Sequence, residues 1–122
     1  MPTNMNGKIC YLELPSNDSS RSSVFYQTIF GWNIRKRGDG ALAFDDATGE
    51  VSGAWVKGRK PATDPAVIIY IMVDSLENTI MLIEKHGGKI VQPPGMDVPE
   101  LTARFSDPDG NVFGLYQEPA KK

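Results

Sequence analysis

The hydrophobic and polar positions of this chain form the same series of patterns twice. Residues 8–14 alternate between the two kinds of side chain and end at Pro15, which is typical of a β-strand. Alternation places Tyr11 and Glu13 on one face of this strand. The other face is more apolar and should pack against a helix, which makes Cys10 a small core residue.

A helix is predicted next. Asp18 or Ser19 can cap its start, and Gly31 can end it after about Phe30. The apolar stripe expected on this helix contains Val24, Phe25, Thr28 and Ile29. Glycines then separate three short predicted strands, at about 32–37, 41–45 and 51–57.

The segment 57–65 is rich in Pro, Gly and charge and is interpreted as a linker, after which the pattern repeats. The β-branched run 67–73 predicts a buried strand. Asp74 with Glu77 resembles a capping box for a second helix, which Gly87 and Gly88 should end. The last three strands are predicted at 89–92, 101–106 and 112–117, with a tight turn at 107–110.

Each half therefore reads as strand, helix and three strands. The halves align with Tyr11 opposite Ile68 and Gly31 opposite Gly88. A βαβββ unit buries only one face of its sheet under its helix, so the other face needs a partner. We predict one α+β domain over residues 1–122, in which modules at about 8–57 and 66–117 form a curved mixed sheet with a cleft.

The composition and charge of the chain exclude some classes of function. The chain has 122 residues and a net charge of −2, and its Lys and Arg residues are scattered. This distribution argues against nucleic-acid binding. The start of the chain lacks a signal-peptide pattern, no apolar stretch could span a bilayer, and the single cysteine cannot form an internal disulfide. These features favour a cytoplasmic protein that does not associate with membranes.

The order of these elements resembles the glyoxalase/bleomycin-resistance/dioxygenase superfamily, also called vicinal oxygen chelate. The segments that carry the resemblance are 25–32, 87–91, 96–99 and the Asp-Pro-Asp-Gly-Asn turn at 107–111. Each segment alone is weak, but their order and spacing extend the likeness from about residue 8 to 117. The resemblance implies the glyoxalase/bleomycin-resistance fold. Because relatives commonly pair, it also predicts that this chain forms a homodimer.

The resemblance also implies where a metal would bind. Metal-dependent members place ligands on the first, fifth and eighth strands, positions that fall here on Tyr11, Ile68 and Gly114, with a less certain fourth-strand position near Gly53. Ile and Gly supply no ligand atom, and one phenolate is not a site. The only histidine, His86, falls at the end of the second helix. We therefore predict no metal and no cofactor, the alternative being a divalent metal at a non-standard site.

Several residues are candidates for binding a ligand in the cleft. They are Tyr11, Glu13, Trp55, Ile68, Tyr70, Arg104, Gly114 and Tyr116. The aromatic members suit a flat or apolar ligand, or they fill the cleft or a dimer interface. Glu13 and Tyr11 are the candidate catalytic pair, although Glu13 could equally form a structural ion pair. Arg104 could clamp a carboxylate or neutralise Glu13.

Three functions remain open from the sequence. The first is a metal-free protein that binds a small apolar or aromatic molecule, as bleomycin-resistance relatives do. The second is a lyase, isomerase or dioxygenase of the superfamily that uses a displaced metal or metal-free acid–base chemistry. The third is an interaction module whose cleft is closed.

Overall fold

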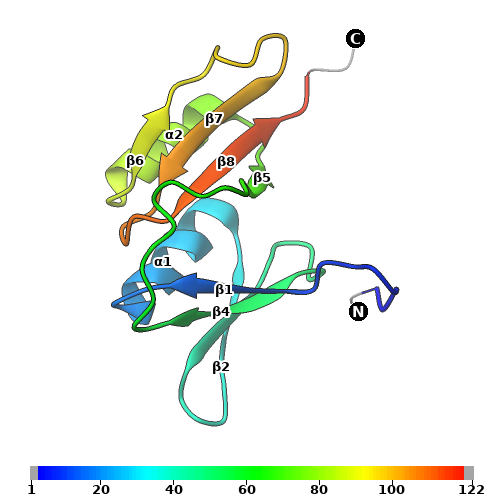
Figure 1. Cartoon of the computed structure of the whole chain (residues 1–122), viewed down its shortest axis with the longest axis vertical. Coiled ribbons are helices and arrows are strands. Elements are labelled where there is room, and N and C mark those ends of the chain that lie inside the picture. Colours follow the sequence, from blue (N-terminus) through cyan, green and yellow to red (C-terminus); the bar gives the residue numbers. More distant parts are fainter. Residues whose placement is uncertain (1–2, 120–122) are drawn as a thin grey trace. The chain divides into compact units, whose positions relative to one another are not determined.

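A computed structural model describes residues 3–119, and the chain divides into two compact units, Met1–Pro61 and Ala62–Lys122. The boundary falls inside the segment predicted as a linker. The N-terminal unit contains β1 (Tyr11–Pro15), α1 (Ser19–Phe30), β2 (Asn33–Lys36), β3 (Leu42–Asp45) and β4 (Ser52–Val56). Its sheet has the order β1-β4-β3-β2, in which β1 is parallel to β4 and the other pairs are antiparallel (Figure 1).

The C-terminal unit repeats this topology. It contains β5 (Tyr70–Met72), α2 (Leu76–Lys85), β6 (Lys89–Gln92), β7 (Leu101–Ser106) and β8 (Val112–Gln117). The sheet order is β5-β8-β7-β6, with β5 parallel to β8. The predicted α+β class and the two βαβββ modules are confirmed. That the two modules together enclose a cleft stays a prediction.

Both helices begin at a capping side chain. The Asp18 carboxylate accepts a hydrogen bond from the Arg21 amide at the start of α1, and Gly31 ends that helix in the left-handed region, as predicted. In α2 the cap is Ser75, whose hydroxyl accepts from the Asn78 amide. The prediction of Asp74 as the cap was one residue early, because the adjacent serine makes the capping bond.

The core of the N-terminal unit is a cluster of aromatic rings. Tyr26 is fully buried, and its ring stacks on that of Trp32 with 4.6 Å between centroids. The Phe44 ring lies 4.5 Å from Trp32 and 4.9 Å from Trp55. Val24, which was predicted to lie on the buried stripe, is exposed. The stripe is rotated, because burying Phe25 and Tyr26 turns the neighbouring Val24 toward solvent.

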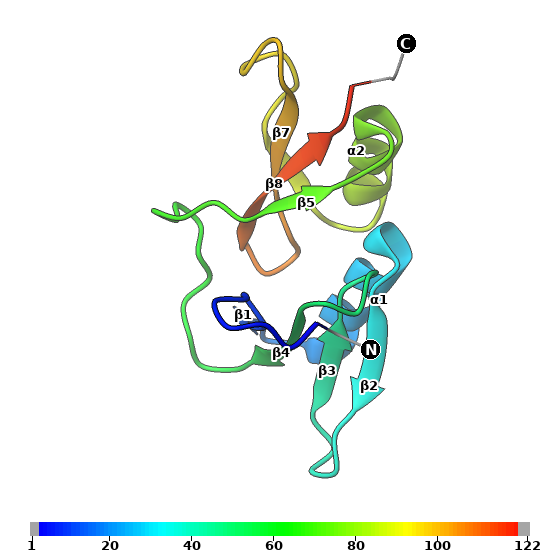
Figure 2. The same cartoon turned by 90° about the vertical axis from the view of Figure 1, so that its right-hand side faces the viewer.

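The core of the C-terminal unit lies between α2 and one face of its sheet (Figure 2). Ala103, Phe105, Phe113 and Leu115 are buried there. The turn between β7 and β8 is held by the buried Asp107 carboxylate, which accepts from the amides of Asp109 and Asn111 and from the Asn111 side chain. Among the described residues, no helix is long and apolar enough to cross a membrane.

Candidate functional site

The N-terminal sheet has one face packed on α1 and a second face that no helix of this unit covers. Parallel pairing sets Tyr11 beside Ser52 and Glu13 beside Ala54, so these four residues share a face. Leu14, the residue after Glu13 along the strand, is buried on the α1 side. We call the face that contains Tyr11 and Glu13 the N-terminal helix-free face.

Arginines engage both candidate residues of β1. The Arg37 guanidinium donates a hydrogen bond to the Tyr11 hydroxyl and lies 5.9 Å from the centre of its ring. The Glu13 carboxylate forms an ion pair with Arg59, with 2.6 Å between Oε1 and Nη2. Arg59 is therefore the partner of Glu13, in place of the Arg104 considered from the sequence. The strand register could not predict this ion pair, because Arg59 lies outside the paired strands, in the segment after β4.

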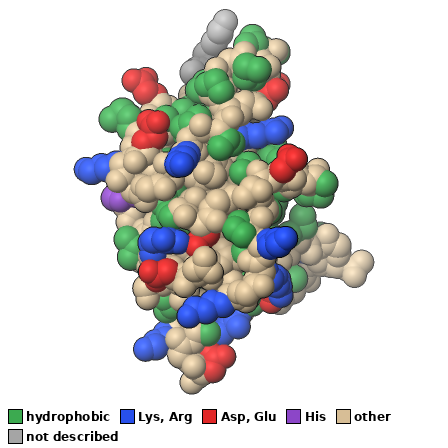
Figure 3. Space-filling view, turned by 60° about the vertical axis from the view of Figure 1, so that its left-hand side comes forward, with side chains coloured by type: hydrophobic (Ala, Val, Ile, Leu, Met, Phe, Trp, Pro, Cys, Tyr) green, Lys and Arg blue, Asp and Glu red, His purple; other side chains and the backbone are tan. Residues whose placement is uncertain are grey.

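A second ion pair lies on the same face. Arg35 donates two hydrogen bonds to the Asp45 carboxylate, at 2.8 and 3.1 Å, and the Ser52 hydroxyl donates a third at 2.7 Å. The Arg35 bond, followed by the Ser52 bond, holds the pKa of Asp45 below its usual value. Figure 3 shows basic and acidic side chains together at the lower end of the view, where Figure 1 places the β2–β3 hairpin.

This pair predicts a pH-dependent effect of Asp45→Asn. Because the pKa of Asp45 is lowered by folding, its stabilising effect is present above the unfolded-state pKa of about 4 and disappears as the pH falls through the lower folded value. The Arg35 side chain is 50% exposed, so we expect the variant to lose only about 1 kcal/mol or less at pH 7. Urea unfolding of the parent and of Asp45→Asn at pH 7, 5 and 3 should show their difference in free energy of unfolding decreasing as the pH falls. A difference that stays constant with pH would contradict the assignment.

The prediction that Trp55 faces the ligand is wrong. Trp55 is buried among Phe44 and Tyr26, the second of which belongs to α1. Gly53 lies on this same buried face, so the fourth-strand residue on the helix-free face is Ser52, the register partner of Tyr11. The sequence could not predict which residues of β4 face α1. Ala54 and Trp55 are both apolar, and only the pairing with β1 decides which of them faces the helix.

The C-terminal sheet places three candidate residues in one row. Tyr70 of β5, Gly114 of β8 and Arg104 of β7 are successive partners across the ladder. The Gln117 side chain accepts a hydrogen bond from the Leu76 amide at the start of α2, so Gln117 faces α2. Gly114 is three residues away along β8 and therefore faces the opposite side. We call the face of Tyr70, Gly114 and Arg104 the C-terminal helix-free face.

The Tyr70 ring lies directly over Gly114. A Cβ added at Gly114 would come within 2.4 Å of two ring atoms of Tyr70. The Tyr70 ring thus occupies the space that a side chain at position 114 would need. Tyr70 remains 41% exposed, so part of its ring is available for contact with another molecule.

The row continues with Arg104, whose Nε is buried and has no hydrogen-bond partner among the described residues. Tyr116 shares this face by alternation, and a hydrogen bond to Glu118 raises the pKa of its phenol. Ile68 lies two residues before β5, which is shorter than the strand predicted at 67–73. The structure therefore brings Tyr70, Arg104 and Gly114 together, while Ile68 stays outside the paired strand.

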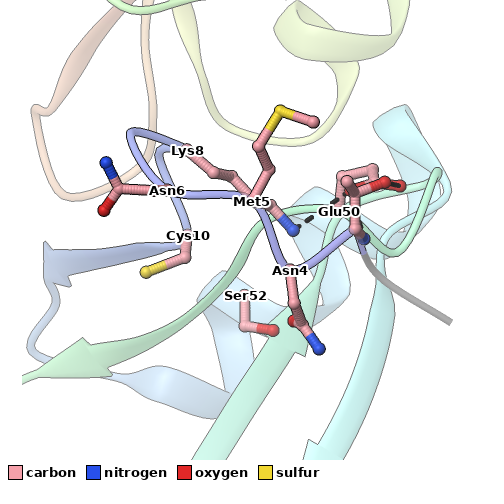
Figure 4. Close-up of a pocket in the computed structure, with 8 residues that line it drawn as sticks. Asn4, Met5, Asn6, Lys8, Cys10, Glu50 and Ser52 are labelled. Carbon is pink, nitrogen blue, oxygen red and sulfur yellow. Dashed lines mark hydrogen bonds and ion pairs between the residues drawn. The ribbon is translucent and has the colours of Figure 1, made fainter.

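A polar pocket of about 520 Å³ lies where the N-terminal segment meets the sheet. It is lined by Thr3, Asn4, Met5, Asn6, Lys8, Cys10, Glu50 and Ser52 (Figure 4). The Thr3 amide and then the Lys8 ammonium lower the pKa of the Glu50 carboxyl. Cys10 is exposed here, so its expected place in the core was wrong. The sequence carried no signal for this pocket, since it depends on Thr3 reaching Glu50.

Comparison with known families adds to this geometry. A model of the Glyoxalase/Bleomycin resistance protein/Dioxygenase superfamily matches residues 8–115. The chain belongs to this superfamily. It is 28% identical over 127 residues to a glyoxylase-like domain-containing protein of Didymella fabae, covering 96% of this chain and 98% of that protein.

A second similar protein has a slightly lower sequence identity. The anthracycline biosynthesis protein DnrV of Streptomyces peucetius is 26% identical over 131 residues, which cover 92% of this chain and 47% of that protein. The chain thus spans about half the length of that relative.

Two solved structures share the fold. The fosfomycin resistance protein FosX of Listeria monocytogenes aligns over 94% of each chain, with a TM-score of 0.76 and 19% identity. TnmS3, an antibiotic binding protein from Streptomyces sp. CB03234, gives a TM-score of 0.68 and 22% identity, over 95% of this chain and 100% of its own. At these identities the likeness shows the fold alone.

The residues at the superfamily's metal positions do not fit a divalent cation. Tyr11 supplies a phenol that already accepts from Arg37, and Ile68 and Gly114 supply no ligand atom. The Tyr70 ring fills the space in which a carboxylate side chain at position 114 would start. Across residues 3–119, no group of three or more His, Cys, Asp or Glu side chains is placed to hold a metal ion.

Proposed function

We propose that this chain is a glyoxalase-like protein that binds a small apolar or aromatic molecule without the superfamily's metal centre. One observation carries the proposal: the Tyr70 ring lies over Gly114 and remains partly exposed. An aromatic surface therefore occupies the place of the eighth-strand ligand. A flat apolar molecule can stack on such a ring in an offset or edge-on geometry.

The surroundings of Tyr70 support a binding role. Met72 follows on the same face of β5, is exposed, and has a flexible side chain that adapts to apolar ligands. Tyr116, its register partner on β8, adds a second aromatic ring. TnmS3, which shares the fold, is an antibiotic binding protein, and this supports ligand binding as the role of the present chain. The proposed contact residues are thus Tyr70, Met72 and Tyr116, with Arg104 beside them.

The proposed acid–base alternative has less support. Glu13, the candidate base, is paired with Arg59, and the Tyr11 hydroxyl is bonded to Arg37. Each side chain is thus already used in a contact within its own unit. Binding without catalysis leaves both contacts as they are.

The proposal is tested by titrating three neutral aromatic amides, benzamide, naphthamide and anthraquinone carboxamide, into the protein and into Tyr70→Ala and Tyr70→Phe. We expect at least the larger amides to bind saturably. Tyr70→Ala should weaken this binding about tenfold, because it removes the stacking surface, whereas Tyr70→Phe keeps the ring and should bind as the parent does. Isothermal titration calorimetry measures the dissociation constants.

Two controls make this result decisive. Elemental analysis of the protein used for the titrations should show no stoichiometric transition metal, and stoichiometric metal would contradict the metal-free part of the proposal. Val24→Ala, an exposed position on α1 of the other unit, should leave binding unchanged. If neither an aromatic amide nor an aromatic acid binds, or if Tyr70→Ala binds as tightly as the parent, the proposed function is wrong.

A further inference from the structure

The C-terminal helix-free face contains a guanidinium, that of Arg104, with one buried nitrogen that has no hydrogen-bond partner. Nε of Arg104 is buried and unpartnered, and no ion pair joins Arg104 to a carboxylate among residues 3–119. Buried polar groups in folded proteins are almost always bonded, so an orphaned guanidinium nitrogen requires an explanation. In contrast, Arg35 and Arg59, in the N-terminal unit, both have carboxylate partners.

Arg104 lies beside the aromatic surface formed by Tyr70. Arg104 and Tyr70 are both register partners of Gly114, one on each side. Because Gly114 has no side chain, nothing from the central strand separates the Tyr70 ring from the Arg104 position. A molecule stacked on Tyr70 would thus have its edge directed along the row toward the guanidinium.

The nearby polar groups do not neutralise this cation. Thr102, two residues along β7, donates its hydroxyl to Asp97 at 2.5 Å, so that carboxylate is already bonded. The Tyr116 phenol is bonded to Glu118. The residues that register places beside Arg104 and Tyr70 on this face, Gln92 of β6 and Met72 of β5, are uncharged. Lys89 lies farther along β6, opposite Ser106, and is a second cation of this face. The face therefore offers an unpaired guanidinium beside an apolar surface.

We infer that the natural ligand is an aromatic acid, whose anionic group binds Arg104 while its ring stacks on Tyr70. This inference rests on the proposed function and adds the chemical class of the ligand. A planar guanidinium binds a carboxylate through two parallel hydrogen bonds, and such charge-assisted bonds are among the strongest in proteins. The acid supplies the carboxylate partner that Arg104 lacks among residues 3–119.

The test compares each amide used above with its parent acid: benzoic, naphthoic and anthraquinone carboxylic acid. Members of a pair share the same rings and differ in charge. We expect each acid that binds to do so about tenfold to a hundredfold more tightly than its amide at pH 7. Arg104→Met should abolish this preference, so that each acid binds no more tightly than its amide, and Arg104→Lys should keep part of it, since it retains the charge without the planar fork.

Two further measurements separate ligand binding from a structural role. Lys89→Met removes a cation from the adjacent strand β6 of the same sheet and should leave the preference intact. Arg104→Met should have an unchanged or higher thermal midpoint without ligand, because it removes an unsatisfied buried donor. An arginine needed for folding would instead lower the midpoint when replaced.

The possible outcomes distinguish this inference from the proposed function. If amides bind through Tyr70 but acids bind no more tightly, or if Arg104→Met keeps the preference, the aromatic-acid inference is overturned and the proposed function stands. If neither acids nor amides bind, both are overturned. If Arg104→Met fails to fold while Arg104→Lys folds and binds acids and amides equally, Arg104 is structural and the inference is wrong.

Discussion

Gly53→Ala is expected to lower the free energy of unfolding of the N-terminal unit by about 3 kcal/mol, because the added methyl group has no space. A Cβ at this position would lie 2.3 Å from the Leu12 carbonyl oxygen and 2.3 Å from the Phe44 ring. The oxygen belongs to the backbone of the paired strand β1, so it cannot move aside as a side chain could. The strands β1 and β4 would have to separate.

The measurement uses the position of the tryptophans. Both of them, Trp32 and Trp55, lie in the N-terminal unit, so their fluorescence during urea unfolding reports on that unit. Gly38→Ala is the matched control, because a Cβ there would meet nothing within 4 Å and its φ is not positive. The control should stay within about 0.5 kcal/mol of the parent. Equal stability of the two variants would show that the approach of β1 to Gly53 is not as close as described.

Phe44→Ala is expected to lower the free energy of unfolding of the same unit by about 4 kcal/mol. Phe44 is fully buried, and its ring packs against those of Trp32 and Trp55. Truncation would leave a cavity in the middle of the aromatic cluster. Neither tryptophan can refill that cavity without leaving its contact with Tyr26.

The control for this prediction is Val24→Ala, which truncates an exposed residue of α1 and should change stability by about 0.5 kcal/mol or less. Tryptophan fluorescence in urea again gives the unfolding curve. Phe44→Leu should lie between the parent and Phe44→Ala, because it keeps part of the volume. If Phe44→Ala were as stable as Val24→Ala, the aromatic cluster could not be the centre of this core.

These two stability variants also help to interpret the binding experiments. Gly53 and Phe44 lie in the N-terminal unit, whereas Tyr70, Gly114 and Arg104 lie in the C-terminal unit. A loss of amide binding in Tyr70→Ala with an unchanged tryptophan unfolding curve would therefore assign the effect to the C-terminal face. Far-UV circular dichroism then shows whether the C-terminal unit itself stays folded.

Much of the fold could be predicted because its signals are local. Asp18 caps α1 through the next few residues, Gly31 ends it, and the turn at 107–110 forms through its own Asp107 side chain. The predicted cap of α2, Asp74, was wrong because the neighbouring Ser75 can make the same capping bond and does so. The segment 67–73 became a three-residue strand, since only Tyr70–Met72 pairs with β8.

The candidate site could be predicted only in part. The sequence identified Tyr70, Arg104 and Gly114 as residues of one face, and the register agrees with that placement. It could not tell that Trp55 faces α1, because the alternation within β4 is ambiguous until β1 pairs with it. Nor could it find Arg59 as the partner of Glu13, since the residues are 46 positions apart, from 13 to 59.

The sequence alone determined the superfamily, the order of the elements and the absence of ligand atoms at positions 68 and 114, because each depends on which residues are present and on their neighbours. Only the tertiary structure decided what occupies the space at Gly114 and which charges are paired. Those outcomes depend on strand register and on side chains that meet across long separations. The Tyr70 ring over Gly114 and the unpartnered Arg104 beside it arise from that register.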